Sequence, residues 1–243
     1  MASLTQHRPQ SNVARELGNS FHFCGNARDH LGCATSSSAD WEELRASWDD
    51  LERDPYMADG GAYRSRRYSE FEIDPCRNNL LVLPHVPFTQ SLDFNYLNGG
   101  IDRNYLPITE QTIENPVFRQ ILMSCAVVLE SLHPATRWRA QVFQNRIWAR
   151  PSEKGNPTPE GVHRDGVDYV LTLLGNRYQI EGGESFTYLA DRHTKVAATT
   201  LADPGEFIFL DDVRMSHGVT PITCTYPEQE GYRDVLVAMY SLL

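Results

Sequence analysis

EFIFLDD (206–212) and YRDVLVAMYSLL (232–243) are two of five short segments in the C-terminal half of the chain that have the composition of β-strands. The others are RWRAQVFQNRIWAR (137–150), VDYVLTLLG (167–175) and ESFTYLA (184–190). β-Branched and aromatic residues are frequent in all five, and Gly, Pro and Asp turns separate them. No helical pattern intervenes between them, which argues against Rossmann and TIM-barrel architectures.

Two amphipathic helices are expected upstream of these strands. The first should begin at Asp40, which has a glutamate three residues later as in a capping box, or at Ser38, and end near Pro55. The second should begin at the N-cap Asn115 and end before Pro134. Helices followed by many strands predict a mainly β protein with flanking helices, a sandwich or barrel.

The length of 243 residues is compatible with a single domain over 1–243. We place the barrel core at about 137–243, whereas 1–40 carries only a weak pattern and is not assigned. The formal net charge of −10 would repel phosphate backbones, so nucleic acid is not expected as a partner. No apolar run could span a membrane or serve as a signal peptide, and five cysteines without a C-x-x-C pair indicate reduced thiols in the cytoplasm.

A candidate metal site comes from the stretch GVHRDGVDYV (161–170). In an extended chain residues i and i+2 project from the same face, so His163 and Asp165 can bind one ion together. Downstream, DDVRMSHGVTPI (211–222) supplies His217. Two histidines and one carboxylate are typical of the facial triad of non-haem Fe(II) oxygenases, although an H-x-D triplet alone also occurs in exposed polar turns.

A candidate anion site lies on the last strand. Alternation there places Arg233 on the same face as Val235, Val237 and Met239. A guanidinium on an apolar face needs an anion, and its planar fork suits a carboxylate. A salt bridge to a neighbour such as Glu230 is the alternative.

These motifs together resemble the Fe(II)/2-oxoglutarate dioxygenases, which have a double-stranded β-helix (jelly-roll, cupin-like) fold. The closer resemblance is to the bacterial 2OG-Fe dioxygenase family that contains the L-isoleucine hydroxylases and the N-succinyl-amino-acid hydroxylases. It is supported by the R-x-R-x-Y-S pattern in YRSRRYSEF (63–71) and by the G-G turn in EGGESFTY (181–188). FQNRI (143–147) is similar to the family's H-Q-x-R strand, with Phe143 in place of the His. The resemblance extends from about residue 60 to the C-terminus.

The resemblance implies that His163, Asp165 and His217 are catalytic and bind Fe(II), and that Arg233 binds the distal carboxylate of 2-oxoglutarate, with O2 as the second cosubstrate and ascorbate as an activator in vitro. Asp165 favours hydroxylation, because halogenases of this fold carry a small residue there. Further cosubstrate-binding and substrate-binding residues are also implied. The former are Gln144, Arg146 and Thr220, and the latter are Arg64, Arg66 and Tyr68.

The expected activity is hydroxylation of an aliphatic carbon of a free L-amino acid or a close derivative. The alternatives are a hydroxylase of N-acylated (N-succinyl) amino acids, a hydroxylase of peptide or protein side chains, and a non-catalytic cupin-like binding module. The expected partner is a small molecule, with neither nucleic acid nor membrane, and a homodimer is left open.

Overall fold

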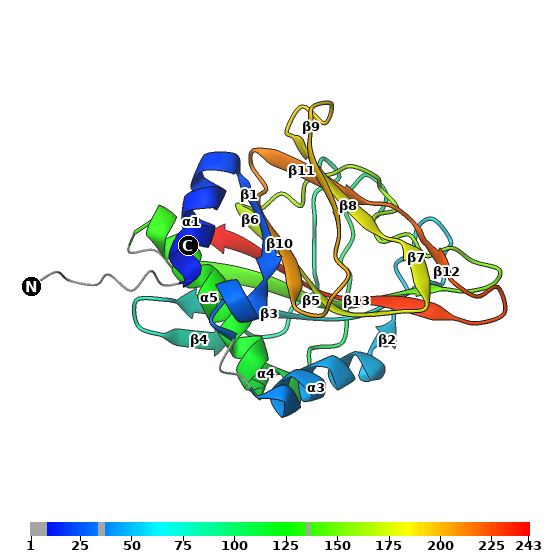
Figure 1. Cartoon of the computed structure of the whole chain (residues 1–243), viewed down its shortest axis with the longest axis horizontal. Helices are drawn as coiled ribbons and strands as arrows, with labels where there is room; N and C mark the ends of the chain where they lie inside the picture. Colours follow the sequence, from blue (N-terminus) through cyan, green and yellow to red (C-terminus); the bar gives the residue numbers. More distant parts are fainter. Residues whose placement is uncertain (1–8, 34–36, 135–136) are drawn as a thin grey trace, which may run out of the picture.

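The computed structural model describes residues 9–33, 37–134 and 137–243. A large antiparallel sheet dominates it, with the strand order β1-β10-β6-β13-β5-β3-β2 and β4 paired with β3 (Figure 1). Its strands are β1 (His22–Asn26), β2 (Glu52–Arg53), β3 (Arg64–Asp74), β4 (Asn79–Val82), β5 (Trp138–Ala149), β6 (Tyr169–Tyr178), β10 (Glu206–Asp211) and β13 (Gly231–Leu242).

Two small antiparallel sheets complete the β structure, one with the order β11-β8-β9 and one pairing β12 with β7. Figure 1 shows them above and to the right of the large sheet. Large and small sheets together form the jelly-roll core that the resemblance implied. The strands are β7 (Ile180–Gly182), β8 (Glu184–Leu189), β9 (Lys195–Thr200), β11 (Met215–Val219) and β12 (Ile222–Cys224).

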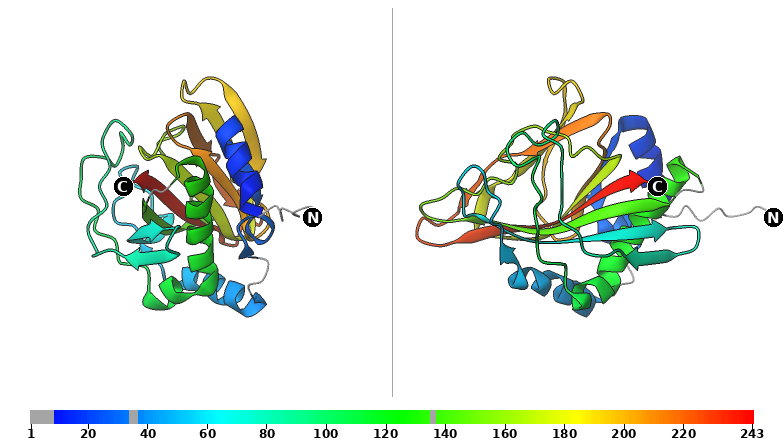
Figure 2. Two further views of the ribbon diagram at one scale, coloured as in Figure 1. Left: turned by 90° about the vertical axis from the view of Figure 1, so that its left-hand side faces the viewer. Right: turned by 180° about the vertical axis from the view of Figure 1, so that it is seen from behind.

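Helices cover the outer face of the large sheet, and Figure 2 shows α5 and α1 standing side by side there. Apolar side chains of α1, α3 and α5 pack with those of β3, β5, β6, β10 and β13 in one buried cluster. The helical segments are α1 (Pro9–Ser20), α2 (Ala27–His30), α3 (Ser38–Ala46), the 3-10 turn η2 (Ser47–Asp50), α4 (Glu110–Glu114) and α5 (Pro116–Leu132).

The second expected helix is confirmed as α5, because the Asn115 side chain accepts hydrogen bonds from two backbone N–H groups at its start. The first helix begins earlier than expected. Its N-cap is Ser37, and Asp40 is the third helical residue, whose carboxylate completes a reciprocal capping box. The regular helix ends at Ala46 and continues as a 3-10 turn, so it is also shorter than expected.

All five expected strand segments are strands, and the N-terminal third adds four more, β1 to β4. The large sheet therefore extends beyond 137–243. Within the described residues no helix is long and apolar enough to cross a membrane, and all five cysteines are free thiols.

Candidate active site

His163 and His217 face each other as an isolated antiparallel pair, because each backbone N–H donates to the other's carbonyl oxygen at 2.9 Å. The Nε2 atom of His163 lies 3.6 Å from Oδ1 of Asp165, and Nε2 of His217 lies 3.5 Å from Oδ2 of the same carboxylate. One ligating atom from each residue lies within 4.8 Å of the other two. The structure therefore brings the three sequence-predicted residues together with donor atoms suited to a divalent transition metal.

Neighbouring groups fix these side chains in place. Nδ1 of His163 donates to the carbonyl oxygen of Gly161 at 3.0 Å, which leaves Nε2 directed to the site. The carboxylate of Asp212 accepts hydrogen bonds from the backbone N–H groups of Asp165, Gly166 and Val167, at 3.0, 2.8 and 3.2 Å. The loop that carries Asp165 is thus anchored to the end of β10.

The three groups strongly perturb one another's protonation. Burial alone would lower the pKa of His163, but the hydrogen bond and charge of Asp165 raise it to about 9. Burial, assisted by the positive charge on His163, lowers the pKa of His217 to about 4. Burial also opposes ionisation of Asp165, yet the two histidines lower the pKa of its carboxyl. Metal ligation requires an unprotonated Nε2, so binding of a divalent cation would compete with the proton that Asp165 favours on His163.

Arg233 lies on β13 with only 1% of its surface exposed, and it lines the same cavity as the triad. Its Nε and Nη2 atoms have no hydrogen-bond partner, so the sequence alternative of a salt bridge to Glu230 is not realised; Glu230 accepts from Arg150 instead. Burial, followed by the charge of Arg177, lowers the pKa of Arg233 to about 10. A buried guanidinium with free N–H groups is a fitting site for a carboxylate ligand.

The cavity measures about 810 Å³ when the open space at its mouth is counted. The expected alternation of β13 is confirmed, since Arg233, Val235, Val237 and Met239 all line it. On the other walls lie residues from β3, β5 and the loops around them. They include Arg64, Arg66, Phe88, Gln90, Arg103, Phe143 and Glu160.

Arg64 and Arg66 project into this cavity from β3. Nε of Arg64 donates to Oδ2 of the buried Asp54 at 2.7 Å, and Nε of Arg66 lies 3.1 Å from that oxygen without hydrogen-bond geometry. Burial opposes ionisation of Asp54, but the charges of Arg66 and Arg64 lower its pKa. One carboxylate thus serves two guanidinium groups, and Nη2 of Arg64 and Nε of Arg66 have no hydrogen-bond partner.

Gln144 and Arg146 lie on the opposite face of β5, which corrects the expectation that they bind the cosubstrate. Arg146 donates to both carboxylate oxygens of Asp234, at 2.7 and 2.9 Å, and Nε2 of Gln144 donates to Ser47. The two residues do share a face, but that face meets η2, and neither lines the cavity. Their neighbour Phe143 lines it instead.

Thr220 and Tyr68 are also placed differently from the expectation. The Thr220 hydroxyl accepts from the backbone N–H of Glu184 at 2.9 Å, so it fixes the turn into β8 and does not line the cavity. The Tyr68 hydroxyl contacts Glu70 and accepts from Gln141. The Tyr68 ring packs against Phe143 at a centroid distance of 4.6 Å, so it supports the cavity wall from behind.

A family model that covers most of the chain decides its family. The family model described as 2OG-Fe dioxygenase matches residues 45–239. The chain belongs to the 2OG-Fe dioxygenase family. It is therefore an enzyme, an oxidoreductase that uses Fe(II), 2-oxoglutarate and O2, which replaces the binding-module alternative. No curated protein sequence matches the chain significantly.

Three solved structures share the fold of this dioxygenase. A bsmA homolog from Methylobium petroleophilum PM1 is 28% identical, with a TM-score of 0.85 over 96% of this chain and 92% of that one. IDO from Bacillus thuringiensis is 17% identical, with a TM-score of 0.80 over 96% and 99% of the two chains. The Fe(II)/(alpha)ketoglutarate-dependent dioxygenase TqaL is 16% identical, with a TM-score of 0.75 over 96% and 86%.

Several residues at the centre of the dioxygenase were not singled out from the sequence. Arg103 lines the cavity from the long loop before α4, where its guanidinium lies 4.7 Å from the ring centroid of Phe88. Gln90 in the same loop donates to the carbonyl oxygen of Asp165 at 2.9 Å. Glu160 lies beside His163, and Asp212 fixes the Asp165 loop. The loop that carries Gln90 and Arg103 has no sequence periodicity, so no pattern pointed to these two residues. Glu160 and Asp212 could have been found, because they are carboxylates that flank the H-x-D motif and the distal His motif.

Proposed function

We propose that this dioxygenase hydroxylates an aliphatic carbon of a small free L-amino acid or a close derivative. The observation that carries the proposal is that one cavity is lined by four buried arginines, each with an N–H group that has no hydrogen-bond partner. We assign Arg233, on β13, to one ligand, and treat Arg64 and Arg66 on β3 together with Arg103 of the loop before α4 as a second set. Two carboxylate ligands, the cosubstrate and an amino acid, would satisfy both sets.

His163, Asp165 and His217 would hold the iron from one side, because their ligating atoms are already gathered and His163 is oriented by Gly161. When bound there with 2-oxoglutarate and O2, Fe(II) supplies the oxidising power for C–H hydroxylation. Arg233 would bind the distal carboxylate of 2-oxoglutarate, and the unpaired Nε and Nη2 atoms provide a two-pronged donor.

The second arginine set would bind the substrate carboxylate. Asp54 neutralises one charge of the Arg64–Arg66 pair, and no ion-pair partner of Arg103 occurs among the residues that the structure describes. The set therefore carries an excess of positive charge in a partly enclosed space. Holding the carboxylate end rigidly would place a remote C–H bond at a fixed distance from the iron.

Apolar side chains would enclose the rest of the substrate. Phe88, Phe143, Val237 and Met239 line the same cavity as the arginines. They exclude water from the reacting carbon and match an aliphatic side chain. The loop that carries Phe88 and Arg103 forms part of the cavity wall, and the space that it helps to enclose suits a small apolar amino acid better than a peptide.

Mass spectrometry of products from a panel of aliphatic L-amino acids and their N-succinyl derivatives, with Fe(II), 2-oxoglutarate and ascorbate, tests the proposal. We expect at least one free amino acid to give a product 16 mass units heavier than itself. Coupled turnover should form this product in an amount equal to that of succinate. Arg64→Met should raise the KM for the amino acid more than the KM for 2-oxoglutarate. Hydroxylation of N-succinyl derivatives alone would favour the N-acylated alternative, and no product from either class would refute the proposal.

A further inference from the structure

Glu160 is a buried carboxylate in the active-site cavity that the proposed function has not used. It lies three residues before His163, and its side chain is 10% exposed. Its Oε2 atom has no hydrogen-bond partner. Among the residues described by the structure, neither a lysine nor an arginine is ion-paired with it, although several arginines line the same cavity.

Glu160 has one ion-pair contact among the described residues, with His163 of the metal site. Oε1 of Glu160 lies 3.4 Å from Nε2 of His163, the nitrogen directed to the metal site. Oε2 of Glu160 has no hydrogen-bond partner, and Glu160 lines the same cavity as the metal site. A buried carboxylate oxygen without a donor is unfavourable unless a ligand pairs with it.

Glu160 is not part of the compact metal-binding group. That group consists of His163, Asp165 and His217, whose ligating atoms lie within 4.8 Å of one another. A fourth protein ligand would also occupy one of the three positions that the facial arrangement leaves open for cosubstrate and oxygen. A cationic group of the substrate is therefore the fitting partner for this carboxylate.

We propose that Glu160 binds the α-ammonium group of the substrate and thereby selects free amino acids over N-acylated ones. The inference rests on the proposed function, in which Arg64, Arg66 and Arg103 bind the α-carboxylate. The cavity then presents a cationic wall and an anionic wall to a zwitterion. An N-acylated amino acid has no positive charge for Glu160, and its amide N–H would leave the carboxylate uncompensated.

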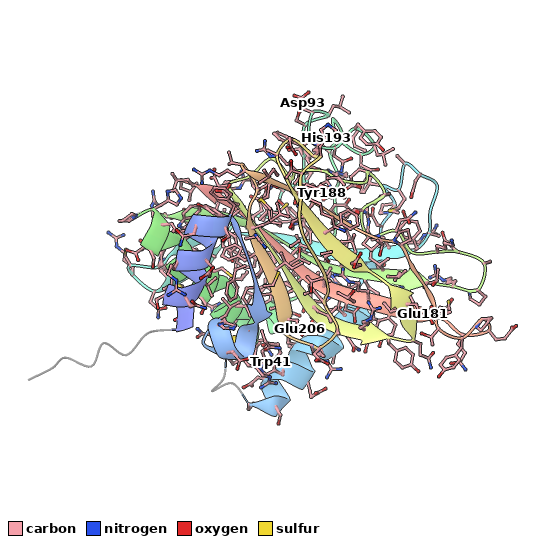
Figure 3. The ribbon with its side chains drawn as sticks, turned by 45° about the horizontal axis from the view of Figure 1, so that its top comes forward. Trp41, Asp93, Glu181, Tyr188, His193 and Glu206 are labelled. Atoms are coloured by element: carbon pink, nitrogen blue, oxygen red, sulfur yellow. The ribbon has the colours of Figure 1, made fainter. Side chains whose placement is uncertain are left out.

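The test compares Glu160→Gln with wild type and with Glu181→Gln. The control makes the same change on an exposed carboxylate of β7, which Figure 3 labels on the right-hand side of the molecule. The probes are the best amino acid of an L-leucine, L-isoleucine and L-methionine panel, its N-acetyl derivative and its des-amino acid. We expect Glu160→Gln to lower kcat/KM for the free amino acid at least about tenfold, the loss of one charge-assisted hydrogen bond. Values for the two analogues should stay the same or rise, because Gln leaves no uncompensated charge beside them, and Glu181→Gln should match wild type.

Binding measurements separate substrate recognition from iron chemistry. Calorimetric titration of the amino acid into protein loaded with Mn(II) and 2-oxoglutarate should show the same loss for Glu160→Gln, with smaller loss for Glu160→Asp, which keeps the charge. Metal affinity and 2-oxoglutarate half-saturation should be unchanged in both variants. Loss of metal affinity would instead assign Glu160 to the metal site, and an unchanged preference for the free amine would overturn the inference. If wild type neither binds nor hydroxylates any free amino acid, the proposed function fails before Glu160 is tested.

Discussion

Replacing Arg233 with methionine should make the metal-free dioxygenase more stable while abolishing 2-oxoglutarate binding. The guanidinium is 1% exposed, and its Nε and Nη2 atoms have no partner, so the folded protein holds a desolvated charge that awaits a ligand. Methionine fills a similar volume without a charge. An active-site residue of this kind lowers stability in the free enzyme and contributes binding energy once its anion arrives.

The magnitude follows from the unpaired atoms. A buried polar group without a partner costs roughly 1–3 kcal/mol, so removing two from Arg233 should raise the free energy of unfolding by at least about 2 kcal/mol, the lower end for two groups. In a chain of this length about 2 kcal/mol corresponds to an increase in Tm of roughly 4–8 °C. The nearby charge of Arg177, which also lowers the pKa of Arg233, adds to the gain.

Arg146 provides the matched control, because it is also a buried arginine, 6% exposed, on the neighbouring strand β5. It is fully paired, with two hydrogen bonds to the buried Asp234 and an ion pair with Asp49. Arg146→Met leaves the Asp234 charge buried without a partner and should lower stability by about 3–5 kcal/mol. The two substitutions are thus expected to change stability in opposite directions.

Urea unfolding of EDTA-treated protein at neutral pH, followed by far-UV circular dichroism, measures both effects. Calorimetric titration of 2-oxoglutarate into Mn(II)-loaded protein measures the loss of binding, which should occur in Arg233→Met. If Arg233→Met unfolds at a lower urea concentration than wild type, or still binds 2-oxoglutarate with wild-type affinity, the reasoning is wrong and Arg233 is a structural residue.

Three further predictions concern the metal site and the core. Alanine at His163, Asp165 or His217 should abolish turnover and weaken Fe(II) binding in anaerobic titrations, and an unchanged affinity would contradict the assignment. Asp212→Asn removes the acceptor charge that anchors the Asp165 loop, so metal affinity should fall about 10–100-fold while circular dichroism is retained. Trp48→Ala deletes a buried ring on the outer face and should cost about 3–5 kcal/mol in urea unfolding, with metal affinity preserved.

The sequence predicted those parts of the site that depend on local geometry. Strand alternation is a property of neighbouring residues, so the face shared by Arg233, Val235, Val237 and Met239 could be derived without knowing what it meets. The pairing of His163 with Asp165 follows from the same rule. The facial-triad pattern joined His217 to this pair, and the resemblance to a known family connected the three residues with Arg233.

The residue positions that the sequence did not predict correctly depend on tertiary contacts. Alternation showed that Gln144 and Arg146 share a face, but it could not show that this face meets Asp234 and η2 rather than the cavity. Arg103 belongs to a loop without periodicity, so its place in the cavity is set by packing against Phe88. The helix α3 starts earlier than expected because the N-cap is Ser37 rather than Asp40, and the Ser37 hydroxyl accepts from the backbone N–H of Asp40.

The backbone pair between His163 and His217 separates the chemistry of this enzyme from the choice of its substrate. Both histidines are held by reciprocal hydrogen bonds between main chains, whereas the loop at 83–109 supplies Phe88 and Arg103 to the wall but no metal ligand. Grafting a different loop between β4 and α4 would therefore change the part of the wall that Phe88 and Arg103 form. A graft that keeps Gln90, which donates to the carbonyl oxygen of Asp165, would leave the metal ligands in place. The fold is therefore suited to loop exchange, which would change the substrate that is accepted while the metal-binding residues stay in place.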